Sequence, residues 1–216
     1  MKALDYIFKK YNLNPNQRSP IEIPNQNRYH LAHLFNELGY KTGAEIGVEE
    51  ATYSKAICER VKNVKLYCVD PWKVYRRRHK DFNRKEPDQK MCDEFYEISK
   101  KRLEPYNARI IRKTSMEAVK NFEPNSLDFV YIDGHHEFRH AVDDISEWIK
   151  IVRTGGIISG HDYCRRKDWR YLVQVVEAVK GYTQAYHIKY WFVMGRKEII
   201  EGEARDACRS WFWVKR

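Results

Sequence analysis

The feature that most constrains the fold of this chain is a short apolar run, Leu127–Ile132, that leads directly into Asp133-Gly134-His135-His136. The run is rich in aromatic and β-branched residues, and Pro124-Asn125-Ser126 precedes it. Such a run between turn residues predicts a buried central strand of a parallel sheet. Open α/β sheets bind ligands at the carboxyl ends of their strands, so we predict a functional site just after this one.

A second stretch further along the chain repeats this plan. The apolar run 155–160 begins with two glycines and leads into His161-Asp162-Tyr163. If the two strands are neighbours, their ends meet at one edge of the sheet. The side chains delivered there are Asp133, His135, His136, His161 and Asp162. We predict that this edge is the active site.

Strand and helix patterns alternate from Gly43 onward, which predicts a parallel sheet with right-handed crossovers. The predicted strands are 44–48, 65–69, 108–112, 127–132 and 157–160, and the predicted helices are 52–61, 91–103, 115–122, 141–152 and 172–179, the last closed by Gly181. Two aromatic runs in the tail, 190–194 and 211–214, predict an antiparallel hairpin.

The first forty residues predict a helical addition to this sheet. A short amphipathic helix over 2–11 is followed by a Pro-containing connector, 12–27, and a second helix, 28–38. We therefore divide the chain into an N-terminal helical extension, 1–40, and one domain, 41–216. Within that domain, the highly charged stretch 73–87 lacks an apolar period and predicts an insertion that forms a lid.

Composition excludes several classes of protein. Hydrophobic residues at 43% and aromatic residues at 14% exclude a disordered chain. Apolar runs fall far short of the roughly 18 residues of a membrane span, and the first residues lack a secretory apolar core. The five cysteines form no CxxC pair, which favours unpaired thiols in a reducing compartment. We predict a cytoplasmic protein without a membrane partner.

The formal net charge of +10 has two interpretations. It indicates an anionic partner, such as nucleic acid or a phosphorylated substrate, or it only keeps the surface soluble. The excess is concentrated in 76–80 and 165–167, each after a predicted strand end, which favours an anionic substrate.

The first strand-to-helix turn, Glu45-Ile46-Gly47-Val48, suits a ligand without phosphate. Gly47 lets the backbone approach a ligand closely, and the following helix presents free N–H groups. Asp70 ends the next strand, where an acidic residue can bind both ribose hydroxyls of a nucleoside. The dinucleotide fingerprint G-x-G-x-x-G is absent, so an adenosyl ligand is favoured. An ordinary turn with solvated acids is the alternative.

These motifs together resemble the class I S-adenosylmethionine-dependent methyltransferases. Within them, the chain is similar to a small O-methyltransferase-like group, typified by metal-dependent sugar and natural-product enzymes, with I-D-G-x-H and G-G-x-I-x-x-H-D after strands four and five. The matching stretches are Ala44–Val48, Val69–Trp72, Leu127–His136 and Gly155–Tyr163. Glu50-Ala51-Thr52 stands where the family commonly carries a second glycine. The resemblance implies a Rossmann-like, seven-stranded, mostly parallel sheet flanked by helices.

The resemblance also implies roles for single residues. Gly47 would approach the methionine part of S-adenosylmethionine, and Asp70 would hold its ribose. The cofactor-binding set that it implies is Glu45, Gly47, Asp70, Trp72, Ser115, Met116 and Asp133. Asp133 and Asp162 match the metal-binding carboxylates of metal-dependent members. His136 lies where some members carry their general base, so His136 and Asp133 are the implied catalytic residues.

Physical chemistry supports this metal site and leaves two alternatives. Asp133 and Asp162 are hard oxygen ligands suited to Mg²⁺ or Mn²⁺. The ion would lower the pKa of a substrate hydroxyl, and His136 would accept its proton. Alternatively, the two carboxylates only cap strand ends. A zinc or iron site is the other alternative, with His135, His136, His140 and His161 as its ligands.

We predict metal-assisted transfer of a methyl group from S-adenosylmethionine to an oxygen of a small hydroxylated substrate, sugar-like or anionic. Amino-group methyltransferases commonly carry an N/D-P-P-Y/F turn where this chain has 133–136, which disfavours that chemistry. One alternative is an RNA ribose methyltransferase. The other is a non-catalytic basic module that binds nucleic-acid phosphates. The sequence leaves open whether the chain forms a homo-oligomer.

Overall fold

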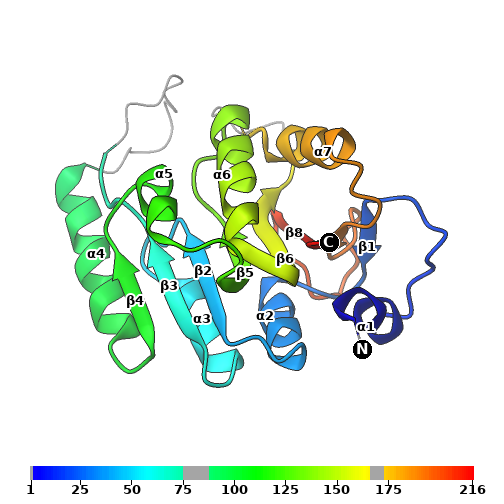
Figure 1. Cartoon of the computed structure of the whole chain (residues 1–216), viewed down its shortest axis with the longest axis horizontal. Helices are drawn as coiled ribbons and strands as arrows, with labels where there is room; N and C mark the ends of the chain where they lie inside the picture. The colour runs from blue at the N-terminus through cyan, green and yellow to red at the C-terminus, as the bar shows by residue number, and fades with distance from the viewer. Residues whose placement is uncertain (1, 75–87, 166–172) are drawn as a thin grey trace.

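The computed structural model describes residues 2–74, 88–165 and 173–216. It shows one twisted sheet with helices on both faces (Figure 1). The strands are β1 (Ile21–Ile23), β2 (Thr42–Ile46), β3 (Lys65–Val69), β4 (Ala108–Ile111), β5 (Leu127–Ile132), β6 (Val152–Tyr163), β7 (Phe192–Met194) and β8 (Arg209–Val214). The helices are α1 (Ala3–Lys10), α2 (Arg28–Glu37), α3 (Thr52–Arg60), α4 (Gln89–Leu103), α5 (Ser115–Ala118), the 3₁₀ turn η1 (Val119–Asn121), α6 (Phe138–Ile151) and α7 (Val175–Ala185).

The described strands form an eight-stranded sheet in the order β1-β7-β8-β6-β5-β2-β3-β4. Only β8 runs antiparallel to its neighbours β6 and β7. The predicted Rossmann-like class and the C-terminal hairpin are confirmed. The sheet has one strand more than predicted, because Ile21–Ile23 in the N-terminal connector pairs in parallel with β7. Three residues between two prolines are too few to show an alternating pattern.

The core lies in two layers, and β5 contributes to both. Phe129 and Tyr131 point toward the layer that contains α1, α2, α3 and α4. Val130 and Ile132 point toward the layer that contains α5, α6 and α7. Because successive side chains of a strand point to opposite faces, a strand covered on both faces must be apolar throughout. This explains why the central run lacks polar alternation.

Strand β2 pairs in parallel with both β3 and β5. The chain crosses from β2 outward to β3 and β4, and then returns to β5 on the other side of β2. This reversal makes the carboxyl ends of β2 and β5 the point where the strand order changes direction, and open α/β sheets bind ligands at such a point. The turn after β2 and the turn after β5 meet there.

Some local predictions differ from the structure. Helix α7 continues through Gly181 to Ala185, although Gly181 was expected to end it. Strand β6 is longer than predicted and spans Val152–Tyr163. Nearly all of the expected lid, 73–87, lies outside the described residues. No helix among the described residues is long and apolar enough to cross a membrane.

The expectation of unpaired thiols is wrong for two of the five cysteines. Cys164, after β6, forms a disulfide with Cys208, before β8. Cys58, Cys68 and Cys92 are free. The pair is brought together by the antiparallel contact of β6 and β8, which sequence spacing does not reveal. Cysteine usage therefore no longer supports the cytoplasmic prediction.

Candidate functional site

The ends of β5 and β6 bring four of the predicted side chains together. Ile132 pairs with Gly160, so the residues that follow this pair, after β5 and in the last part of β6, emerge side by side. His136 Nε2 lies 2.7 Å from Asp162 Oδ2. His161 Nδ1 lies 3.7 Å from Asp133 Oδ1 and 3.6 Å from Asp162 Oδ1. The resulting cluster alternates carboxylates and imidazoles at the edge where the sequence predicted a site.

The two carboxylates of this cluster have opposite pKa shifts. Burial raises the pKa of Asp133 to about 6, and the charge of Asp162 adds to this effect, against the attraction of His161. Burial acts in the same direction on Asp162, but its contacts with His136 and His161 outweigh burial and hold its pKa well below the usual range. Asp162 therefore holds its negative charge more firmly than Asp133, whose carboxylate takes up a proton more readily.

The backbone at Asp162 is held in an unfavourable conformation. Its φ is +55°, in the left-handed region that non-glycine residues seldom adopt. The pairing of β6 with β8 shifts register between Gly160 and Tyr163, and this irregularity turns the Asp162 side chain into the cluster. Strain of this kind costs about 1–3 kcal/mol and concentrates at functional sites.

The cluster encloses a very small cavity of about 10 Å³. Its lining residues are Ile132, Asp133, Gly134, His135, His136, Ala141, His161, Asp162, Val175 and Trp211. Such a volume admits one water-sized group. One potential ligand atom each of Asp133, His136 and Asp162 lies within 4.8 Å of the others. The buried Nε2 of His161 has no hydrogen-bond partner among the described residues. The cavity thus has room and donors for a small cation or an oxygen atom.

The turn after β2 is pressed against the turn after β5. Gly47 has a φ of +87°, and a Cβ atom there would lie 2.2 Å from the backbone oxygen of Asp133. The Asp133 N–H donates to the Ile46 carbonyl at 2.7 Å. Only glycine fits this close approach. The predicted cofactor turn and the predicted metal site are therefore in direct contact.

Asp70 organises the same turn from the end of β3. Its Oδ2 accepts hydrogen bonds from the N–H groups of Val48 at 2.9 Å and Glu49 at 3.1 Å. Its Oδ1 accepts from the Trp72 N–H at 2.7 Å. A carboxylate has about four acceptor positions, so Asp70 retains capacity for a ligand hydroxyl. Glu45 lies behind the turn, hydrogen-bonded to the Ser54 hydroxyl, and burial raises its pKa to about 8.

The other predicted cofactor-binding residues, Trp72, Ser115 and Met116, are at least partly buried. The Trp72 indole is buried, donates to the Glu49 carbonyl at 2.8 Å and packs against Tyr96. Ser115 begins α5, where its hydroxyl donates to Asp144 on α6. Met116 follows Ser115 and is half-buried. The structure therefore places Trp72 within the α3–α4 layer and Ser115 within contacts to α6.

Two site residues were missed by sequence reasoning. Arg28, at the start of α2, places its Nη1 4.0 Å from Asp133 Oδ2, and its buried Nε has no partner among the described residues. Asp144 is 5% exposed, and burial raises its pKa to about 6. A signal existed for Asp144, because it shares the apolar stripe of Ile145 and Trp148 on α6. No comparable signal marks Arg28.

The four histidines of the zinc or iron alternative do not form one cluster. His136 and His161 contact the two carboxylates, whereas His135 and His140 form a group with Glu137. The expectation of four imidazoles around one ion is therefore wrong.

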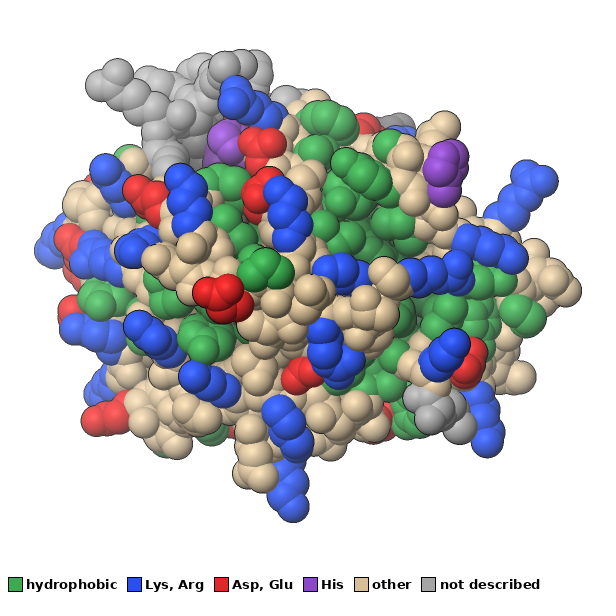
Figure 2. All heavy atoms as spheres, in the orientation of Figure 1, with side chains coloured by type: hydrophobic (Ala, Val, Ile, Leu, Met, Phe, Trp, Pro, Cys, Tyr) green, Lys and Arg blue, Asp and Glu red, His purple; other side chains and the backbone are tan. Residues whose placement is uncertain are grey.

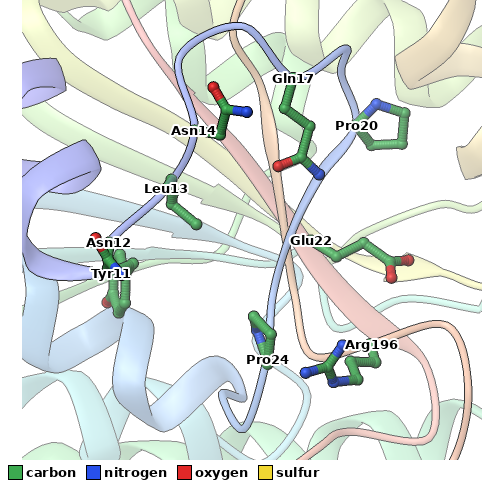
Figure 3. Close-up of a pocket in the computed structure, with 9 residues that line it drawn as sticks. All are labelled: Tyr11, Asn12, Leu13, Asn14, Gln17, Pro20, Glu22, Pro24 and Arg196. Atoms are coloured by element: carbon green, nitrogen blue, oxygen red, sulfur yellow. The ribbon is translucent and has the colours of Figure 1, made fainter.

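A larger hollow lies away from this cluster. It has a volume of about 540 Å³ and lies beneath the loop before β1 (Figure 3). Its lining residues are Tyr11, Asn12, Leu13, Asn14, Gln17, Pro20, Glu22, Pro24 and Arg196. It contains none of the predicted site residues. Figure 2 shows Lys and Arg side chains spread over the visible face among apolar and acidic ones, without one continuous basic patch.

The comparisons with known proteins place this fold in a family. Residues 41–163 match a family model described as a methyltransferase domain, so the chain belongs to that methyltransferase family. The match includes both strand ends and the turn after β2. Sequence comparison finds a relative in Sinorhizobium fredii, the uncharacterized protein y4gI, 27% identical over 101 residues. These residues cover 45% of this chain but only 11% of that protein.

Two solved structures show the same fold at low sequence identity. An O-methyltransferase from Bacillus cereus in complex with SAH is 13% identical with a TM-score of 0.60, covering 99% of this chain and 89% of the other. A precorrin-6y C5,15-methyltransferase from Geobacter metallireducens is 13% identical with a TM-score of 0.55, covering 87% and 88%. These likenesses concern the fold alone, and the acceptor atom must be argued from the site.

Proposed function

We propose that this chain transfers a methyl group from S-adenosylmethionine to an oxygen of a small hydroxylated substrate, assisted by a divalent cation at Asp133 and Asp162. One observation carries the proposal: the Asp133–His136–Asp162 cluster lies in direct contact with the turn after β2. A methyl acceptor and a methyl donor must meet, and this is the point where a cofactor turn and an acid–base cluster adjoin.

The residues around the turn fit an adenosyl cofactor. S-Adenosylmethionine, when bound, supplies an electrophilic methyl group on a sulfonium sulfur. Gly47 lets the turn after β2 pack against the backbone of Asp133, and Asp70 fixes this turn through the N–H groups of Val48 and Glu49. Asp70 also offers acceptor positions for ribose hydroxyls. The match of residues 41–163 to a methyltransferase domain supports this assignment.

The cluster also fits a hard divalent cation. The carboxylates of Asp133 and Asp162 offer oxygen ligands within 4.8 Å of each other, next to a cavity of about 10 Å³. Oxygen ligands suit Mg²⁺ or Mn²⁺. Each carboxylate disfavours the charge of the other, so a cation there would remove a repulsion. When bound, the cation would lower the pKa of a coordinated substrate hydroxyl.

His136 is the proposed base. Its Nε2 contact with Asp162 at 2.7 Å orients the imidazole toward the cluster. An imidazole accepts a proton near neutral pH, which suits the deprotonation of a hydroxyl group. Arg28 contributes positive charge beside Asp133.

Calorimetric titration with S-adenosylmethionine and Mg²⁺, followed by EDTA, tests the proposal. We expect micromolar cofactor binding in the wild type. Asp70→Ala should abolish it, whereas Asp133→Ala should retain the cofactor and lose the Mg²⁺ response and turnover. Asp143→Ala, which removes a partly exposed acid on α6, serves as a matched control. Absence of cofactor binding in the folded wild type would overturn the proposal.

A salt series distinguishes the nucleic-acid alternatives. Binding through phosphate contacts weakens steeply with salt and should survive Asp133→Ala. If RNA binds in this manner while hydroxylated small molecules are not methylated, the substrate assignment is wrong even when the cofactor binds.

A further inference from the structure

The loop after β5 carries a second group of potential metal-binding side chains, next to the proposed active site, whose cavity His135 also lines. His135, Glu137 and His140 each offer a ligand atom within 4.8 Å of the other two. The rings of His135 and His140 lie 4.3 Å apart, measured between centroids. Glu137 is partly buried and His140 is exposed. Because His140 is exposed, solvent and small ions can reach this group from the surface.

The start of α6 explains why these three residues meet. Glu137 is the N-cap of α6, and His140 follows one turn later on the same face. The Glu137 side chain accepts no capping hydrogen bond from the helix. It lies instead beside the two imidazoles. The Glu137 N–H contacts His135 Nδ1 at 3.3 Å, a long contact that a metal–nitrogen bond would displace.

The chemistry of this set differs from that of the active-site cluster. Two imidazoles and one carboxylate are the donors of zinc and other late first-row ions. Mg²⁺ and Ca²⁺ prefer oxygen ligands. An ion pair between Glu137 and protonated His135 and His140 would also bring these three side chains together, but protonated imidazoles do not bind a transition metal. Metal affinity is therefore the property that separates the two explanations.

We propose that His135, Glu137 and His140 form a binding site for a divalent transition-metal ion of the Zn²⁺ class. Its effect follows from the position of His136, which lies between two of the ligands in sequence. The loop is already tied to the segment before α7, because Gln174 N–H donates to the His136 carbonyl at 2.8 Å and Phe138 N–H donates to Gln174 Oε1 at 3.0 Å. A bound ion would fix the loop from its other side and hold His136 beside Asp162.

Titration of the EDTA-treated full chain with Co²⁺, followed by visible absorption, tests this site. The titration is made in an Asp133→Asn background, which weakens binding at the active-site cluster. We expect one Co²⁺ per chain and displacement of that Co²⁺ by Zn²⁺. His140→Ala should weaken binding on the order of 100-fold, because even residues that only orient metal ligands typically contribute 10–100-fold.

The matched control is His33→Ala, since His33 is also an exposed histidine on a helix, α2. It should leave the Co²⁺ titration unchanged. Glu137→Gln keeps the size of the side chain and should weaken binding about as much as His140→Ala. Cofactor and substrate are absent from the assay, so its outcome is independent of methyl transfer. The proposal is overturned if no Co²⁺ binds, or if His140→Ala and Glu137→Gln both bind it as tightly as the parent.

Discussion

Replacing Gly47 by alanine tests the contact between the turn after β2 and the turn after β5. The new Cβ atom would lie 2.2 Å from the Asp133 oxygen, 2.5 Å from its carbonyl carbon and 2.7 Å from the Gly134 Cα. All three are backbone atoms, so no side-chain rotation relieves the clash. The two turns must move apart, which should also displace the Asp133 carboxylate from Asp162.

The expected loss of stability in Gly47→Ala has two contributions. An alanine at a φ of +87° costs about 1–2 kcal/mol for its left-handed conformation. Overpacking against rigid neighbours costs about 1–3 kcal/mol more. Gly39→Ala is a matched control, because Gly39 has a φ of +72° and nothing within 4 Å of the added atom. It should show the conformational cost alone.

Urea unfolding, followed by circular dichroism, measures both variants. We expect Gly47→Ala to be less stable than Gly39→Ala by about 1–3 kcal/mol, and to lose affinity for S-adenosylmethionine. If the two variants differ by less than roughly 0.5 kcal/mol, the typical scatter of independent substitutions, the turns are not in rigid contact and the reasoning fails.

Two further predictions concern charges in and around the site. Burial raises the pKa of Glu45 to about 8. The contribution of Glu45 to stability is therefore present below about pH 4.5 and is lost as the pH rises through 8. Glu45→Gln should flatten the fall of the unfolding free energy between these pH values, and an unchanged slope would contradict the raised pKa. Arg28→Met removes a cation 4.0 Å from Asp133, so Mg²⁺ should bind on the order of fivefold more tightly, since such a charge pair is worth about 1 kcal/mol in a water-like medium. Arg60→Met, whose guanidinium also stacks on Tyr29, should leave calorimetric Mg²⁺ binding unchanged, and equal effects of both variants would refute a role for Arg28 at the cluster.

Local sequence patterns predicted the elements that build the site. The apolar run 127–132 and the stripe of α6 are each long enough to show their period, and each formed the predicted element. The polar residues after β5 and those in the last part of β6 must emerge at one sheet edge once these strands are neighbours. For this reason the proximity of Asp133, His136 and Asp162 could be predicted from the sequence alone.

Local sequence patterns could not predict contacts between distant segments. Ile21–Ile23 is a strand only because β7, about 170 residues later, offers a free edge beside it. The disulfide of Cys164 and Cys208 likewise depends on the antiparallel pairing of β6 with β8. In both cases the partner is chosen by the folded sheet, and the local sequence carries no trace of that choice.

The sequence by itself determined the fold class and the chemical types of the side chains at the sheet edge, because periodicity and strand-end position are local properties. Only the tertiary structure decided how those side chains pair. It assigned His136 to Asp162, separated His135 and His140 into a group with Glu137, and brought Arg28 beside Asp133. The directions of side chains around a loop and the approach of a distant helix are set by packing, which no single segment encodes.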